Sequence, residues 1–419
     1  MALILLVLAA LTLLTATIKH TNTQRKRWIL IATGLLSILI IANQYYLSTL
    51  GLVFQPSDPE HYFNIARNAA DYAAIVQDTA EASNTYYYLL NRLYIDTFEE
   101  PWAVSIALLL TNLWLFMAAY LYGTKNFRFA TIEYFLLAHP YLALIAIRNV
   151  RDLHILSLSI IIFSLALTHR NTLQKGIIYA GLAISRPFYV AIILLARFAE
   201  KNKASLTKIH IYSTVIGLAV LLGVLLISSN SFYHFTIERM VAGYGFYNEY
   251  NATYEQLKLS WLTYDRSLKF AYQILTIFCE SIAKFIFTPI LPSYLEKYLS
   301  QNNSIYLDIY TTLDMMLIFL GIIVNVFYFI PIFLKLSWEN LKNPNLIDSP
   351  FIAAILIVLI YSFAHLGGTD IRIRYSFIFA FCVSIIFTSR ILKIQRTRII
   401  SILLLIVAPS ILLLLRIAF

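Results

Sequence analysis

Residues 144–158 read LIAIRNVRDLHILSL, which is two apolar runs joined by a short charged segment. The segment holds Arg148, Arg151, Asp152 and His154, far more charge than a turn between two apolar helices requires. Helices of about 20 apolar residues cross the hydrocarbon layer of a bilayer, and runs of this kind recur along the chain. The stretch therefore predicts a membrane hairpin and raises the question of why its turn is so charged.

The composition indicates a membrane protein. Of the 419 residues, 60% are hydrophobic and 13% are charged, and the mean hydropathy is +0.72. Soluble globular domains carry about 25% charged residues. The formal net charge of +10 is typical of a membrane protein, in which the excess Lys and Arg lie in the cytoplasmic linkers. It does not indicate a nucleic-acid partner. The cysteines, Cys279 and Cys382, lie in apolar surroundings and predict neither a disulfide nor a metal site.

The apolar runs predict an all-α polytopic fold with about ten full transmembrane helices and one re-entrant pair of half-helices. The first run precedes its positive charges, so it predicts a retained helix and not a secretion signal. The sequence contains no nucleotide-binding motif and no zinc motif, and no cofactor is expected. The runs lie at 2–18, 28–50, 102–122, 130–147, 153–168, 176–198, 209–229, 306–334, 350–366, 375–390 and 399–418.

Basic linkers predict the orientation of these helices. The segments KHTNTQRKR (19–27) and TSRILKIQRTR (388–398) carry several Lys and Arg residues each, which places them in the cytoplasm. The N-terminus then lies outside, as do two long loops at 51–101 and 230–305. The second loop contains an apolar segment that predicts an interfacial helix or a re-entrant dip. With no separate soluble domain, residues 1–419 are expected to form a single integral membrane domain.

The run at 176–198, GIIYAGLAISRPFYVAIILLARF, has basic residues at both ends. If both ends are cytoplasmic, the run cannot cross the membrane once. Proline disfavours helical backbone at the residue before it. The sequence therefore predicts two half-helices that meet at Arg186 and Pro187 near the middle of the membrane. The alternative is a single helix kinked at Pro187.

Several arginines contradict the rule that external turns avoid basic residues. Two external turns and the tip of the broken helix carry them. Guanidinium groups match the geometry of phosphate, and ionisable groups at membrane depth usually mark a substrate path. We expect an anion-binding crater at the outer leaflet, suited to a lipid phosphate, a diphosphate or acidic sugars. Alternatively, the arginines pair with nearby acids and helix-end carbonyls and only hold the turns. The residues are Arg148, Arg151, Asp152, Arg186, Asp370, Arg372 and Arg374.

The first external loop offers a candidate base. Asp58, Glu60 and His61 stand where the loop leaves the second apolar run. A carboxylate at this place can accept a proton from an attacking sugar hydroxyl, while His61 can contact the same substrate. Asp58 followed by Pro59 is also a good helix start, so Asp58 can serve as a cap, as a base, or as both.

This loop resembles the first external loop of GT-C-type membrane glycosyltransferases. DPEHYFNIARNAADY (58–72), followed by NTYYYLLNRLY (84–94), is similar to a loop whose leading aspartate is the catalytic base in that superfamily. Here Asp58 takes that position. The family pattern has its acidic pair adjacent, whereas Pro59 separates the pair here, which leaves open whether Asp58 or Glu60 is the base.

Two later segments, GLAISRPFYVAIILLARF (181–198) and GGTDIRIRYSFIFAF (367–381), are also similar to segments of the GT-C enzymes. The layout resembles Wzy-type polymerases, including the EpsG-like branch, which have two large periplasmic loops and functional periplasmic arginines. The resemblance implies a GT-C-like fold in the bacterial inner membrane, with a periplasmic N-terminus. It implies glycosyl transfer at the periplasmic face from an undecaprenyl-(di)phosphate-linked donor.

The expected reaction is repeat-unit polymerisation in the assembly of O-antigen, capsule or exopolysaccharide. The expected partners are the undecaprenyl-linked donor and acceptor, the lipid bilayer, a flippase and a chain-length regulator. One alternative is a single-sugar GT-C transferase that uses a polyprenyl-phosphate sugar. Another is a lipid-linked oligosaccharide flippase, although transporters usually contain inverted repeats and this sequence shows none. A third is a structural scaffold.

Overall fold

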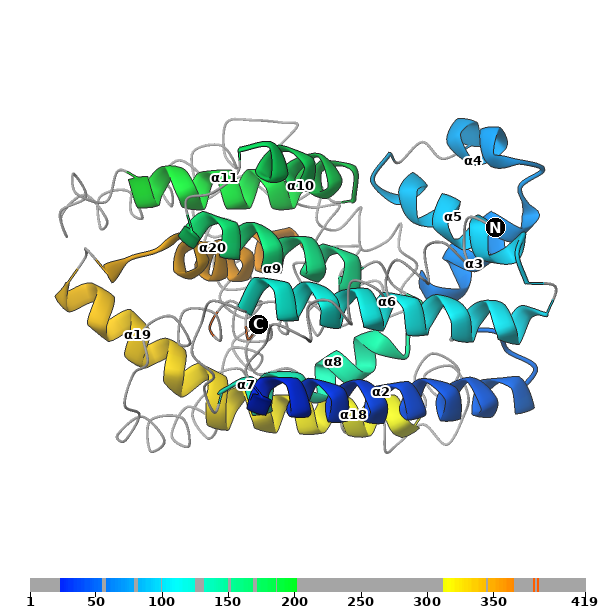
Figure 1. The fold of residues 1–419 in the computed structure, drawn as a ribbon, viewed down its shortest axis with the longest axis horizontal. Helices are drawn as coiled ribbons and strands as arrows, with labels where there is room; N and C mark the ends of the chain where they lie inside the picture. Colours follow the sequence, from blue (N-terminus) through cyan, green and yellow to red (C-terminus); the bar gives the residue numbers. More distant parts are fainter. Residues whose placement is uncertain are drawn as a thin grey trace, which may run out of the picture. The chain divides into compact units, whose positions relative to one another are not determined.

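The structure is a computed structural model of the chain, and all regular structure in its described residues is helical (Figure 1). Contacts divide the chain into two compact units, of which the first holds residues 1–194, 300–321 and 388–391. The described residues are 23–54, 58–78, 82–98, 100–124, 132–149, 152–168, 172–185, 187–201, 312–343 and 346–364, together with 380 and 383.

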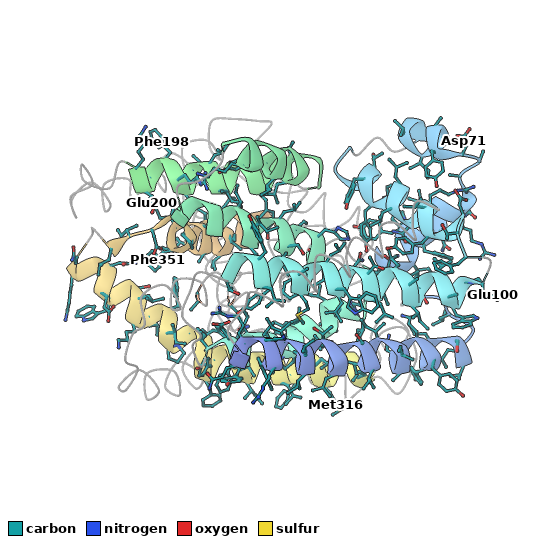
Figure 2. All side chains as sticks on the ribbon, in the orientation of Figure 1. Asp71, Glu100, Phe198, Glu200, Met316 and Phe351 are labelled. Atoms are coloured by element: carbon teal, nitrogen blue, oxygen red, sulfur yellow. The ribbon has the colours of Figure 1, made fainter. Side chains whose placement is uncertain are left out.

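Three helices in these residues are long and apolar enough to cross a membrane: Gln24–Thr49, Pro101–Thr124 and Met316–Asn340. Their surfaces carry exposed large apolar side chains, such as Leu35 and Ile38, which are 62% and 66% exposed. Met316, labelled in Figure 2, also points outward. Contiguous apolar surface of this kind marks contact with lipid or with another apolar partner. The chain is therefore a helical membrane protein, as its composition predicts.

In the first unit, α6 (Pro101–Thr124) packs against α2 (Thr23–Thr49) and α9 (Asp152–Thr168). These three helices occupy the apolar runs predicted at 102–122, 28–50 and 153–168. The other helices of this unit are α3 (Asp58–Asn68), α4 (Tyr72–Asp78), α5 (Ala82–Ile95), α7 (Ile132–Leu137), α8 (Pro140–Ala146) and α10 (Thr172–Ser185), with the first part of α11 (Pro187–Lys201).

The run expected as one helix at 130–147 is two helices, α7 and α8, which separate at His139. Pro140 lacks an N–H and disfavours helical backbone at the residue before it. His139 is extended, with φ −65° and ψ 125°, and its Nδ1 accepts a hydrogen bond from the Tyr141 amide at 3.1 Å. His139 therefore caps α8, and Pro140 occupies the first helical position.

The segment predicted to be the first external loop, 51–101, is largely helical in its described residues and contains α3, α4 and α5. Its helices share a small core of Tyr62, Ile75, Tyr87 and Tyr88, in which the Tyr62 and Tyr87 rings meet edge to face at 5.1 Å. Arg92 Nη1 donates to the carbonyls of Ala66 and Ala69 at the end of α3, where a helix leaves its last carbonyls without intrahelical partners. The loop is thus a packed helical layer.

Within 176–198, α10 ends at Ser185 and α11 begins at Pro187, and the predicted break falls on Arg186, which lies outside the described residues. Re-entry of both halves from the cytoplasm stays a prediction. The apolar runs at 2–18, 209–229, 375–390 and 399–418, and the second loop at 230–305, lie outside the described residues, apart from 380 and 383.

The described part of the run predicted at 306–334, from residue 312 on, forms a helix with a π turn. α18 (Thr312–Val324) continues into η2 (Asn325–Phe329) and α19 (Ile330–Lys342). Pro331 in α19 cannot donate an intrahelical hydrogen bond, and its ring crowds the preceding turn. The wider π turn accommodates this proline. α20 (Ser349–Ala364) follows in the second unit, where Phe333 stacks on Phe351 with ring centroids 5.5 Å apart.

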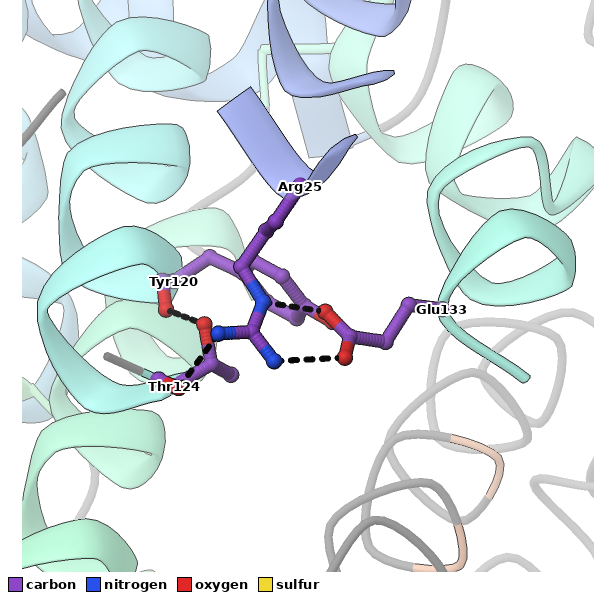
Figure 3. Close-up of polar contacts among 4 residues, drawn as sticks. All are labelled: Arg25, Tyr120, Thr124 and Glu133. Atoms are coloured by element: carbon purple, nitrogen blue, oxygen red, sulfur yellow. Dashed lines mark hydrogen bonds and ion pairs between the residues drawn. The ribbon is translucent and has the colours of Figure 1, made fainter. Parts of the chain in front are cut away.

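A buried ion pair holds α2, α6 and α7 together (Figure 3). Arg25 Nε and Nη2 each donate to a carboxylate oxygen of Glu133 at 2.7 Å, and the two side chains are 1% and 0% exposed. Arg25 Nη1 donates to the Thr124 carbonyl at 2.8 Å, and the Tyr120 hydroxyl donates to Glu133 at 3.0 Å. Because Arg25 lies at the start of α2 and Thr124 ends α6, these two packed helices run antiparallel.

Removal of one partner of this pair should destabilise the protein strongly. We expect Arg25→Met to cost about 3–5 kcal/mol, because it leaves the Glu133 carboxylate buried without its counter-charge. The double variant R25M/E133M should lose less, since no charge stays buried. Thermal unfolding of the detergent-solubilised protein measures both. Arg27→Met, at an exposed neighbour, is the control and should change stability by less than about 0.5 kcal/mol.

Gly321 allows α18 to approach α8 within the first unit. A Cβ at this position would collide with the ring of Tyr141, whose Cζ would lie 2.8 Å away. Tyr141 is itself buried, so the ring has little room to move. We expect Gly321→Ala to destabilise the protein by about 1–3 kcal/mol through overpacking.

The control is Gly34→Ala in α2, where a Cβ meets nothing within 4 Å. This change should be neutral or stabilise by up to about 1 kcal/mol, since alanine favours helix. Unfolding midpoints in one detergent compare the two variants. Equal midpoints would show that the close approach of α18 to α8 is not needed.

Candidate functional site

A continuous set of hydrogen bonds, here called the polar seam, joins the start of α3, α5, α6, the turn between α8 and α9, and α9 itself. It consists of uncharged groups, which is the chemistry expected where water is excluded. Its members are Pro59, Tyr86, Tyr87, Asn91, Asn112, Asn149 and His154.

One half of the polar seam centres on Asn149, in the charged turn that follows α8. Its Nδ2 donates to the Pro59 carbonyl at 3.0 Å and to Asn91 Oδ1 at 2.8 Å. Asn91 Nδ2 in turn donates to the Tyr87 carbonyl at 2.8 Å. Asn149 and Asn91 are both fully buried. The turn after α8 is therefore bound directly to the start of α3.

The other half centres on His154 in the first turn of α9. Its Nε2 lies 2.7 Å from Asn112 Oδ1, and its Nδ1 lies 3.0 Å from the Tyr86 hydroxyl. Asn112 Nδ2 donates to the Tyr87 hydroxyl at 3.1 Å, which leaves Asn112 Oδ1 as an acceptor. His154 must then carry its proton on Nε2, and Tyr86 donates to Nδ1. The hydrogen-bonding roles of His154, Asn112 and Tyr86 are therefore defined.

The polar seam reaches the middle of α6, because Asn112 lies halfway between Pro101 and Thr124. α6 is long and apolar enough to cross a membrane. The part of the seam around Asn112 therefore lies beside the interior of a helix that can cross a membrane, and Tyr87 of α5 contacts it there. Ionisable and polar groups at such a depth are costly and usually have a function.

The structure places the predicted base candidates at the start of α3. Asp58 is its first residue and Pro59 its second, as expected for a helix that begins at Asp58. The Asp58 side chain lies outside the described atoms. Glu60 is half-buried, and His61 is exposed with its ring 6.2 Å from that of Tyr88. The three residues lie within two positions of Pro59, which Asn149 contacts.

Two of the predicted anion-binding residues flank Asn149. Arg148 immediately precedes it and is half-buried, while Asp152 begins α9 and is 3% exposed. Both interact with other groups of the protein, so neither is an unpaired charge. The remaining candidates lie outside the described residues, and their convergence on one crater stays a prediction. They are Arg151, Arg186, Asp370, Arg372 and Arg374.

The seam asparagines were not among the predicted site residues. Their positions in the sequence could have identified two of them as candidates, since Asn112 interrupts the apolar run at 102–122 and Asn149 lies inside the charged turn. His154 belongs to the same charged segment, but the sequence predicted no role for it. Within the described ranges, no group of three His, Cys, Asp or Glu side chains is arranged to hold a metal ion.

Burial controls the ionisation of the tyrosines in α5. It raises the pKa of Tyr86, and it raises the pKa of Tyr87 well above its ordinary value. It also raises the pKa of Tyr94 to about 12. These phenols therefore stay protonated at neutral pH and act as neutral donors and acceptors.

Comparisons with protein-family models, with curated proteins and with solved structures found no match. The function is therefore inferred from the residues and their geometry.

The raised pKa of Tyr94 predicts a loss of stability at alkaline pH. The unfolded phenol ionises near pH 10, whereas the folded one ionises near pH 12. Its stabilising contribution is thus complete below pH 10 and is lost as the pH rises to about 12. Tyr94→Phe should reduce the fall of the unfolding midpoint over this range. Tyr45→Phe, at an exposed side chain, should follow the wild type throughout.

Proposed function

We propose that this protein is a membrane glycosyltransferase that uses an undecaprenyl-(di)phosphate-linked donor at the periplasmic face of the bacterial inner membrane. Repeat-unit polymerisation of a surface polysaccharide is the proposed reaction. One observation carries the proposal: Asn149 donates to the Pro59 carbonyl at 3.0 Å. This bond joins the carboxylate-bearing start of α3 to the turn that carries Arg148.

The proposed reaction needs a base and a cationic site close together. Asp58 or Glu60 takes the proton of the acceptor hydroxyl, and the hydroxyl oxygen attacks the anomeric carbon of the donor sugar. The bond from that carbon to the phosphate oxygen breaks, and the (di)phosphate leaves with the electron pair. Arg148 and the other predicted arginines stabilise its negative charge.

Three features of the described residues support this assignment. Glu60 and Arg148 are half-buried, which strengthens their electrostatic effect relative to bulk water. The polar seam connects the turn after α8 and the start of α3 with Asn112 of α6, a helix long and apolar enough to cross a membrane. The two asparagines at the seam's first half are fully buried, which gives the start of α3 a rigid support.

The proposal is tested by substitution in a strain that lacks the chromosomal gene. Asp58→Asn, Glu60→Gln, Arg148→Ala and Arg372→Ala are expressed singly, and the polysaccharide is separated by gel electrophoresis. We expect loss of the base to lower polymer yield by about a hundredfold or more. Loss of an arginine should lower it by about tenfold to a hundredfold. Single repeat units should accumulate in place of the ladder.

Arg27→Ala, at an exposed residue near the Arg25 pair, is the control and should leave the ladder intact. Full ladders from every site variant, with protein levels equal to the wild type, would refute the proposed site. A wild-type ladder in the deletion strain itself would refute the proposed reaction.

A further inference from the structure

The orientation of the Asn149 amide is determined by its neighbours. Asn91 Nδ2 donates to the Tyr87 carbonyl at 2.8 Å, so Asn91 presents its oxygen to Asn149. The second neighbour, the Pro59 carbonyl, is also an acceptor. Only the amide nitrogen of Asn149 satisfies both, and both of its hydrogens are used. Asn149 therefore acts as a double donor between α3 and α5.

The bond to Pro59 fixes the part of α3 that carries the base candidates. Pro59 stands between Asp58 and Glu60 in the first turn of the helix. A helical carbonyl can accept a second hydrogen bond from outside the helix through its other lone pair. Because Asn149 is 0% exposed, this bond does not compete with bulk water in the folded protein.

We propose that Asn149 is a positioning residue for the transfer reaction, a role that rests on the function proposed above. Its amide holds the start of α3, with Asp58 and Glu60, in register with the turn that carries Arg148 and Asp152. The distance between the base and the phosphate-binding cations is thereby fixed. Loss of this contact lowers kcat and leaves KM little changed, because it misplaces reacting groups without removing a binding group.

A matched pair of variants tests the role. Asn149→Asp and Asn91→Asp each place one carboxylate in the same buried amide pair. Only N149D removes the donor to Pro59, since Asn149 in N91D can still donate to both Pro59 and the new carboxylate. The purified proteins are assayed in nanodiscs, with the undecaprenyl-linked oligosaccharide that accumulates in the deletion strain as substrate. We expect kcat of N149D to lie at least about tenfold below that of N91D, with KM within about twofold.

Hydrogen exchange of the α3 amides gives a readout that does not depend on activity. Exchange in α3 should accelerate in N149D and stay close to wild type in N91D, while α6 is unchanged in both. Asn149→Ser replaces N149D if the latter does not fold. It retains one donor on a shorter side chain, so its kcat should also fall below that of N91D.

Equal kcat in the two variants, an effect confined to KM, or unchanged exchange in α3 would overturn the positioning role. Failure of the proposed function has a different signature, because the wild-type protein would then transfer no sugar. In that case, hydrogen exchange of the α3 amides in N149D and N91D decides by itself whether Asn149 holds α3 in place.

Discussion

The buried Arg25–Glu133 pair is the interaction on which the arrangement of the first unit depends. A guanidinium without access to water must find protein acceptors for its hydrogens, and a buried carboxylate needs donors. Here Arg25 donates to both oxygens of Glu133 and to the Thr124 carbonyl. These contacts fix the start of α2 against the end of α6 and the first turn of α7. Apolar packing alone would allow these helices to slide along one another.

The polar seam applies the same constraint with uncharged groups. The amides of Asn91, Asn112 and Asn149, with His154, can be satisfied only by one another and by nearby tyrosines and backbone. Each such hydrogen bond stabilises the fold only modestly, but each buried polar group left without a hydrogen-bond partner would cost about 1–3 kcal/mol. The seam therefore specifies one arrangement of α3, α5, α6 and α9. In the proposed enzyme, this rigidity supports the charged turn and the candidate bases, where small displacements lower the rate most.

Much of the helical layout could be predicted from local sequence. The apolar runs at 28–50, 102–122 and 153–168 became helices because their length and composition suit a bilayer. The missing N–H and the ring of proline predict a break before Pro187. The same rule applied to Pro140, where the prediction of one continuous helix was wrong. The packing of α3, α4 and α5 within the first loop was not predicted, because their aromatic core forms only when the three helices meet.

Local sequence is sufficient to predict a helical chain that is apolar enough for a membrane, with a helix that begins at Asp58. These properties depend on neighbours within a few residues. The pairing of Arg25 with Glu133, 108 residues away, and the bond from Asn149 to Pro59, 90 residues away, are visible only in the folded chain. Many polar side chains could satisfy these groups equally well in isolation. The choice among them is made by the joint packing of several helices, which no local pattern encodes.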